Sequence, residues 1–583
     1  MLKNIRSYFY NFKKYQMPLE KYVFPLVLML YPLIGVNAGL DVTDTTYSLA
    51  NYEFIDTLNP MWLLSTFLGN VTGAIIMHLP GAGTMLGFGI YSSFIISLTA
   101  LISYYFLQKY MPGWMIFIGT FMAESLCWCP RVIMYNYMTY MFFTLGALFL
   151  VKGIFFWEKQ NVDLFIAGVF LGLNVMVRFP NITETALILV LWFYGVLTRD
   201  DFLNILKKTG ICILGFTTGV AVIFLVISLI YGPGAYFGMI GSLFGMTSGA
   251  SDYTTSGMIS AIIDAYFKTA ADMLILIPCI VAGIIMFLIK SERFVWIKKL
   301  LFAIGLCIVV KYYFAEGIFT RNYYYYDSIF KAAMMFVIIS LILGVIGICG
   351  FLNGNKQEQT LAFLMVMIIL ITPLGSNNYT YPVINNLFVV APIALWIMRR
   401  LMQRLGDRQL HFTWQSTITM VIIVVLIQGI LFHVNFSFVD GADGQKRGET
   451  VKTIPKVGSM VTTSYNARTL EELGKYLSDN NLLGTKALLF GGIPGLSYIF
   501  DLKPAIDTVW PDLDSYSTEI FDEKLIELST SDEPYPVIIV GKDMQGYANI
   551  SDKYDILLDY ISNHDYNIDF ESERFTVYVG DNE

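Results

Sequence analysis

The stretch MWLLSTFLGNVTGAIIMHL, residues 61–79, decides how the rest of the chain is arranged. It is long enough to cross a hydrocarbon core of about 30 Å, but Asn70, Thr72 and His78 interrupt it. If it crosses the bilayer, every later loop changes sides. The choice between the two topologies therefore depends on the charges of the loops that follow.

The sequence around this stretch is typical of a multi-pass membrane protein. Its 583 residues are 56% hydrophobic and only 14% charged, whereas about a quarter of the residues of a soluble chain are charged. Apolar runs of spanning length recur along residues 1–435. Besides 61–79, we predict thirteen spans, at about 22–40, 84–108, 113–129, 132–152, 163–179, 182–198, 209–231, 271–289, 300–316, 328–351, 360–374, 383–398 and 413–435.

The basic residues orient these spans. If 61–79 does not cross, the loops on the N-terminal side of the membrane hold 20 Lys and Arg, against six in the opposite loops before the C-terminal region. Cytoplasmic loops carry an excess of basic residues, and a crossing would move 15 of the 20 outward. We therefore predict a cell-membrane protein with a cytoplasmic N-terminus, an acidic first external loop (41–83) and an extracytoplasmic C-terminal domain.

Six basic residues are exceptions to this pattern, because they map to the outer side, and five of them are candidates for one binding site. A cluster there would suit the phosphate or diphosphate headgroup of a lipid, through charge-assisted hydrogen bonds. The alternative is that each side chain extends from a helix end to the lipid headgroups. The candidates for phosphate binding are Arg131, Arg178, Lys311, Arg321 and Lys331.

The segment GLDVTDTTYSLANYEF, residues 39–54, places two carboxylates where the first span ends. Asp41 and Asp44 are three residues apart, so both can face one cavity. A carboxylate there can accept a proton from an attacking hydroxyl or bind a divalent cation. The alternative is that Asp44 or Thr45 caps the next helix. Most other outer acidic residues, including Glu124 and Glu184, are expected to be solvated.

Neutral polar residues also gather on the outer side. The loop ITPLGSNNYTYPVINN, residues 371–386, contains Asn377 and Asn378, whose amides suit sugar hydroxyls but are equally ordinary in turns. Asn136 lies about one turn inside the fourth span and needs a hydrogen-bond partner there.

The C-terminal region changes character after a linker, 436–465. Residues 466–583 alternate between helices predicted at 468–480, 517–529 and 552–563 and strands predicted at 486–492, 535–541 and 574–580. This pattern indicates a small three-layer α/β domain, with acceptor binding or a lid as its expected role. No nucleotide-binding glycine motif or zinc pattern is present, and no basic face indicates nucleic-acid binding.

The arrangement resembles the GT-C superfamily of membrane glycosyltransferases, which includes protein O-mannosyltransferases, aminoarabinose transferases and oligosaccharyltransferase catalytic subunits. The resemblance rests on the acidic loop after the first span, with Asp44-Thr45-Thr46-Tyr47 as a loose match to the family's D-[ED]-x-x-Y-like setting. It rests also on PRVIMYN, residues 130–136, at the fourth span. The sequence departs from the family by carrying Asn136 where members often have an acidic residue.

The resemblance implies transfer of a sugar, with inversion, from a polyprenyl-phosphate donor to an extracytoplasmic glycan, lipid or protein acceptor. It implies Asp44 as the base, with Asp41 beside it and Tyr47 near the substrate. A divalent cation, Mg or Mn, would bind at Asp41 or Asp44 if one is used.

Three other functions stay open on the residues alone. A lipid or glycan transporter or flippase is the main rival, although the sequence shows no repeated halves. A polymerase or ligase of lipid-linked glycans would use similar chemistry. An inactive relative would bind lipid or polymer through the same cavity.

Overall fold

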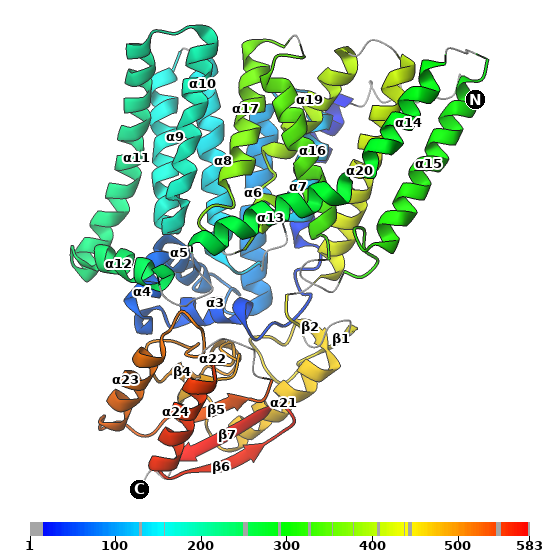
Figure 1. The fold of residues 1–583 in the computed structure, drawn as a ribbon. Coiled ribbons are helices and arrows are strands. Elements are labelled where there is room, and N and C mark those ends of the chain that lie inside the picture. Colours follow the sequence, from blue (N-terminus) through cyan, green and yellow to red (C-terminus); the bar gives the residue numbers. More distant parts are fainter. Residues whose placement is uncertain are drawn as a thin grey trace.

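The computed structural model describes residues 16–127, 131–156, 158–248, 255–289, 293–323, 328–352, 354–376, 378–404, 408–436, 438–440, 446–543 and 550–580. A bundle of long helices packs at one end against a smaller domain that contains a β-sheet (Figure 1).

Eight helices within these ranges are long and apolar enough to cross a membrane. Each overlaps one predicted span, so the chain is a multi-pass membrane protein, as the sequence predicts. They are α6 (Met85–Leu107), α8 (Met134–Phe155), α9 (Gln160–Val177), Phe179–Thr198, α11 (Phe202–Tyr231), Ser256–Leu288, α16 (Phe330–Ile348) and the His411–Asn435 part of α20 (Arg408–Asn435). Phe179–Thr198 combines a 3₁₀ segment, Phe179–Ile188, with α10 (Leu189–Thr198), and Ser256–Leu288 combines α13 (Thr255–Met273) with α14 (Leu276–Leu288).

The other five predicted spans are also helical. They are α2 (Phe24–Leu30), α7 (Gly113–Leu126), α15 (Val295–Ala315), α17 (Lys356–Ile371) and α19 (Val390–Arg404), the last preceded by α18 (Tyr381–Asn385). Four of these helices have fewer than 18 residues, and the fifth, α15, has 21 residues but contains three lysines. The first of the five differs most from its prediction, because helical geometry ends at Leu33 and not near Leu40. Positive φ angles of 71° at Gly35 and 89° at Gly39 turn the chain there.

Residues 61–79 form two short helices, α4 (Pro60–Ser65) and α5 (Phe67–Met77), which break at Thr66. The 11 residues of α5 extend about 16 Å, roughly half the hydrocarbon thickness. Neither helix alone is long enough to cross the hydrocarbon core, and the topology of this stretch stays a prediction. Both helices lie at the end of the bundle that faces the β-sheet domain, together with α3 (Asp44–Glu53) (Figure 1).

Glycines allow α9 and α11 to pack closely. A Cβ on Gly168 would lie 2.0 Å from the carbonyl oxygen of Cys212, and one on Gly215 would lie 2.0 Å from that of Phe165. Small residues at such positions let helix backbones approach in a membrane, where close packing replaces the hydrophobic effect.

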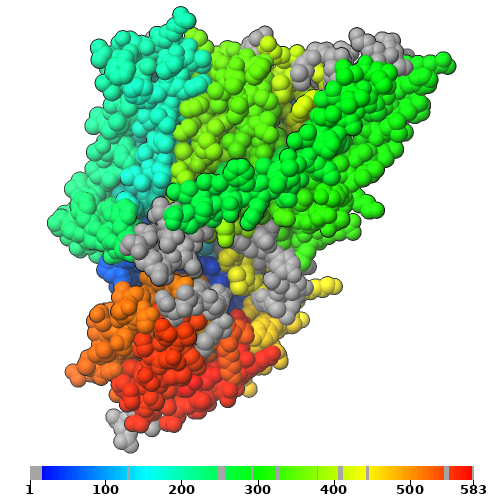
Figure 2. Space-filling view, in the orientation of Figure 1, coloured from blue at the N-terminus to red at the C-terminus, as the bar shows by residue number. Residues whose placement is uncertain are grey.

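Helix α13 crosses the bundle obliquely over α16 and α17, and its surface is visible in Figure 2. The hydroxyl of Tyr266 in α13 donates to the Ile369 carbonyl of α17, at 3.1 Å. Helix α12 (Ala235–Ser248) lies near α4 and the end of α11.

The C-terminal domain contains a five-stranded sheet in the order β4-β3-β5-β7-β6. Strands β4, β3 and β5 are parallel, and β7 and β6 continue the sheet in antiparallel pairs. The bounds are β3 (Lys486–Phe490), β4 (Lys503–Pro504), β5 (Val537–Gly541), β6 (Tyr566–Glu571) and β7 (Phe575–Gly580). A separate hairpin pairs β1 (Arg447–Thr450) with β2 (Val461–Thr463).

Helices cover both faces of the five-stranded sheet, as the alternation of side chains in β3 shows. Leu488 and Phe490 pack with α23 (Thr518–Ser529) and α24 (Ile550–Asn563), whereas Ala487 and Leu489 pack with α21 (Ser464–Asp479) and α22 (Leu496–Ile499). The second core also takes in Leu49 of α3 and Phe88 of α6. One hydrophobic core therefore joins the C-terminal domain to α3 and to the beginning of α6.

Candidate functional site

The Asp41 carboxylate organises the beginning of α3. Its Oδ1 accepts hydrogen bonds from the amide and hydroxyl of Thr43, and its Oδ2 accepts one from the Thr45 amide at 2.7 Å. Asp41 is 2% exposed. The capping role that the sequence suggested for Asp44 or Thr45 therefore belongs to Asp41, because a carboxylate satisfies the free amides of a first helical turn.

Asp44 lies in that first turn and is partly exposed. Its backbone carbonyl accepts a hydrogen bond from the Ser48 hydroxyl. Its side-chain carboxylate accepts none from another described residue. Burial raises the pKa of Asp41 to about 6. Burial and the negative charge of Asp41 raise the pKa of Asp44 to about 7. Asp44 thus has the freer carboxylate and a pKa suited to proton transfer near neutral pH.

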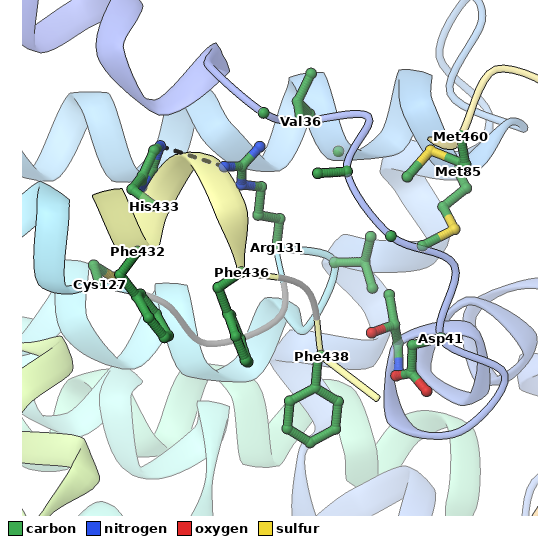
Figure 3. Close-up of a pocket in the computed structure, with 16 residues that line it drawn as sticks. Val36, Asp41, Met85, Cys127, Arg131, Phe432, His433, Phe436, Phe438 and Met460 are labelled. Carbon is green, nitrogen blue, oxygen red and sulfur yellow. Dashed lines mark hydrogen bonds between the residues drawn. The ribbon is translucent and has the colours of Figure 1, made fainter. Parts of the chain in front are cut away.

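A cavity of about 80 Å³ lies between the segment that follows the first predicted span, the α7–α8 connection and the end of α20 (Figure 3). Asp41 and Thr45 line it on one side, and Arg131 and His433 on the other. Phe432, Phe436 and Phe438 provide an apolar wall. The cavity thus combines a carboxylate, a guanidinium and aromatic rings.

The two terminal nitrogens of the Arg131 guanidinium differ in their hydrogen bonds. Its Nη2 donates to the Ile34 carbonyl at 2.8 Å and lies 3.3 Å from Nε2 of His433. Its Nη1 is buried without a hydrogen-bond partner among the described residues. A buried donor without a partner is costly, so this nitrogen is suited to bind an anionic group of a ligand.

The other four phosphate-binding candidates do not line this cavity. Arg178 donates to the Gly375 carbonyl at 3.3 Å and lies over the ring of Tyr135. Lys331 pairs with Asp272 at 3.9 Å. Lys311 and Arg321 are exposed, and Arg321 lies over the ring of Phe314. The structure therefore brings Arg131 alone of the five to the cavity that Asp41 lines.

The remaining substrate-binding candidates are dispersed. Tyr47 makes an edge-on contact with Trp510 of the C-terminal domain, with ring centroids 5.2 Å apart. Asn136 is half-buried in the first turn of α8, and Asn378 is exposed in the α17–α18 loop. Asn377 lies outside the described residues. Neither Asn136 nor Asn378 lines the cavity.

The expectation that Glu124 and Glu184 are solvated is wrong. Glu184 is 3% exposed and accepts a hydrogen bond from Asn174, which is bonded in turn to Asn181. Glu124 in α7 is fully buried, and both of its carboxylate oxygens are without partners within the described residues. The apolar residues around both glutamates in the sequence could have indicated this burial. An ionisable residue within a membrane segment suggests a functional role.

A metal centre is not formed by the described residues, since none of their His, Cys, Asp and Glu side chains gather in groups of three or more. Asp41 and Asp44 are only two carboxylates, and Asp41 already accepts three hydrogen bonds. We assign no step to a bound Mg or Mn ion.

No family model matches the sequence, and no curated protein matches it. Solved structures that resemble the protein are membrane glycosyltransferases of the GT-C class. One is the oligosaccharyltransferase AglB from Archaeoglobus fulgidus in complex with an inhibitory peptide and a dolichol-phosphate, at 11% identity over 98% of this chain and 75% of that chain, with a TM-score of 0.47. Another is ArnT from Cupriavidus metallidurans bound to undecaprenyl phosphate, at 11% identity over 96% of this chain and 97% of that chain, with a TM-score of 0.42. At such identities we argue the function from the site itself.

Proposed function

We propose that the protein is an integral-membrane glycosyltransferase that moves a sugar from a polyprenyl-phosphate donor to an extracytoplasmic acceptor. The observation that carries this proposal is that Arg131, which lines the same cavity as Asp41, has a buried Nη1 without a partner among the described residues. A guanidinium that faces a cavity at the end of a helical bundle suits a lipid phosphate. Asp44 is not among the residues that line this cavity, but it lies three positions beyond Asp41, and its carboxylate suits the activation of a hydroxyl.

In the proposed reaction, an acceptor hydroxyl gives its proton to Asp44 as its oxygen forms a bond to the anomeric carbon. The bond between that carbon and the phosphate oxygen breaks, and the polyprenyl phosphate leaves from the opposite face with inversion. Arg131 stabilises the negative charge that develops on the departing phosphate. Asp41 contributes by fixing the first turn of α3 and by raising the pKa of Asp44.

The test is native mass spectrometry of the gently solubilised protein, with analysis of the lipids that copurify. We expect an adduct with the mass of a polyprenyl phosphate or its glycosylated form. The Arg131→Ala variant should lose it, whereas Arg321→Ala, a change at an exposed arginine outside the cavity, should keep it. Only bulk phospholipid in the wild type, or an adduct that persists in Arg131→Ala, would contradict the proposed donor site.

A further inference from the structure

The C-terminal domain binds the peptide groups on both sides of Asp41. The Asn466 side chain, on α21, donates to the Leu40 carbonyl at 2.7 Å. The Gly495 amide, just before α22, donates to the Val42 carbonyl at 2.9 Å. The residue before Asp41 and the residue after it are therefore both fixed by a domain more than 400 positions further along the chain.

The hydrogen bond from Gly495 to Val42 brings the two backbones so close that only glycine fits at position 495. A Cβ at this position would lie 1.7 Å from Oγ1 of Thr46 and 2.6 Å from the Val42 carbonyl oxygen. The Thr46 hydroxyl donates in turn to the Asp41 carbonyl at 2.7 Å. The φ and ψ of Gly495 are −67° and −17°, which any residue adopts. The need for glycine here therefore comes from space and not from backbone conformation.

Asn466 is itself held by a buried polar network. Its side chain donates to Oδ1 of Asp440 at 2.8 Å and accepts from Arg574, at the beginning of β7. Arg447 donates to Oδ2 of Asp440 at 2.9 Å. Asn466 is fully buried, and Asp440 and Arg574 are less than a tenth exposed. Because each partner is fixed by others, Asn466 has little freedom to release Leu40.

Further contacts join the domain to the rest of the first external loop. Beyond α3, the Asn59 amide donates to the Asp507 carbonyl at 2.8 Å, and the two side chains are bonded at 2.9 Å. At the end of α3, Lys456 of the linker that leads into the domain pairs with Glu53 at 2.6 Å. A domain that swung away as a lid would have to break all of these bonds in each cycle.

We propose that Asn466 and Gly495 are positioning residues for the Asp41 carboxylate, and that the C-terminal domain is a fixed wall of the site. The effect of these two residues on turnover rests on the proposed glycosyl transfer, whereas their effect on the position of Asp41 does not. This replaces the lid that the sequence left open as one role of the domain.

The first experiment measures amide hydrogen exchange in detergent for wild type, Gly495→Val and the matched control Gly448→Val. Gly448 lies in β1, ahead of the C-terminal domain, and a Cβ there would have no atom within 4 Å. We expect exchange of the Thr43, Thr45 and Tyr47 amides to accelerate by about ten-fold or more in Gly495→Val alone. Unchanged exchange at these amides, or equal acceleration throughout α6, would overturn the positioning role.

The second experiment links the domain to the loop by a disulfide in the double variant Asn59→Cys, Asp507→Cys. Turnover of the copurified donor is compared between the oxidised and reduced forms of this one variant, with bond formation verified by mass spectrometry. We expect turnover in the two forms to agree within about two-fold. A loss of turnover on oxidation that reductant restores would show that the domain has to move. Absence of turnover in wild type would refute the proposed function, and the exchange experiment would still decide the positioning role.

Discussion

The guanidinium of Arg131 donates toward the imidazole of His433, with 3.3 Å between Nη2 and Nε2. The histidine ring stacks on Tyr31, with centroids 4.5 Å apart, so the acceptor itself is fixed. This contact directs Arg131, because Nη2 is bound to protein while Nη1 has no partner among the described residues.

The contact predicts a graded effect on lipid binding. His433→Phe keeps an aromatic ring against Tyr31 but removes the acceptor, so we expect undecaprenyl phosphate to bind about two- to ten-fold more weakly. The loss should be smaller than in Arg131→Ala, which removes the charge itself. Titration of the detergent-solubilised variants measures this, with His411→Phe near the other end of α20 as the control. Equal affinity in His433→Phe and wild type would show that His433 does not direct the guanidinium.

Replacing Asp41 and Asp44 should separate stability from chemistry. Asp41→Asn weakens three hydrogen bonds at the beginning of α3, and we expect it to cost about 1 kcal/mol of stability. Near pH 4, where the folded protein holds the Asp44 carboxyl protonated, Asp44→Asn should stay within about 0.5 kcal/mol of wild type. At neutral pH it should abolish sugar transfer, with lipid binding intact. Thermal melting and a transfer assay on the same preparations measure both effects. Retained turnover in Asp44→Asn would remove Asp44 from the role of base.

The raised pKa of Asp44 predicts how the reaction depends on pH. A base must be deprotonated, so the transfer rate should rise with pH up to about 7 and then level off. Asp41→Asn removes a negative charge that raises this pKa, so the inflection should move to lower pH. Single-turnover rates between pH 5 and 9 provide the measurement. An inflection that Asp41→Asn leaves in place would show that the two carboxylates are not coupled.

Stability should show the same titration with the opposite sign. The folded protein holds the Asp44 proton more tightly than the unfolded chain, in which the carboxyl has a pKa of about 4. The free energy that this group contributes to unfolding is therefore largest below pH 4 and decreases as pH rises to about 7. The thermal midpoint of Asp44→Asn, measured against wild type, should become relatively higher across that window. A constant difference between the two midpoints from pH 4 to pH 8 would argue against the raised pKa.

The close packing of α9 on α11 gives a prediction that is independent of the site. Gly168→Val would place its side chain against the backbone of Cys212, and we expect it to cost more than about 2 kcal/mol. Gly210→Val, in α11 where a Cβ would meet no atom within 4 Å, serves as the control. Thermal melting in detergent compares the two, and equal midpoints would refute the crossing as described.

Much of the fold follows from local patterns in the sequence. The apolar runs locate the spans because a bilayer requires about 20 such residues, and the strand at 486–492 stands out because β3 is buried on both faces. Strand β6 was not predicted, since it is an edge strand whose Asn567 and Asp569 are exposed. Its polar sequence gives no hydrophobic pattern to recognise.

The site was less accessible to prediction because it depends on distant contacts. Arg131 and His433 are 302 positions apart, and no spacing rule relates them. The sequence identified Asp41 and Asp44 as a pair but assigned the cap to Asp44 or Thr45, since several acceptors near a helix start compete for the same amides. The sequence led us to expect Glu124 in solvent, because a position at a helix end does not reveal whether protein or water surrounds the side chain.

The bonds from Asn466 and Gly495 to the backbone around Asp41 have a consequence for how the protein is made. Roughly 450 residues separate Val42 from Gly495, and a ribosome adding about 5–20 residues per second needs roughly 20 to 90 seconds to synthesise them. During that interval the first external loop has left the translocation machinery without the partners that shape it. Its final conformation is therefore a late event of biogenesis, completed only when the C-terminal domain has emerged on the same side of the membrane.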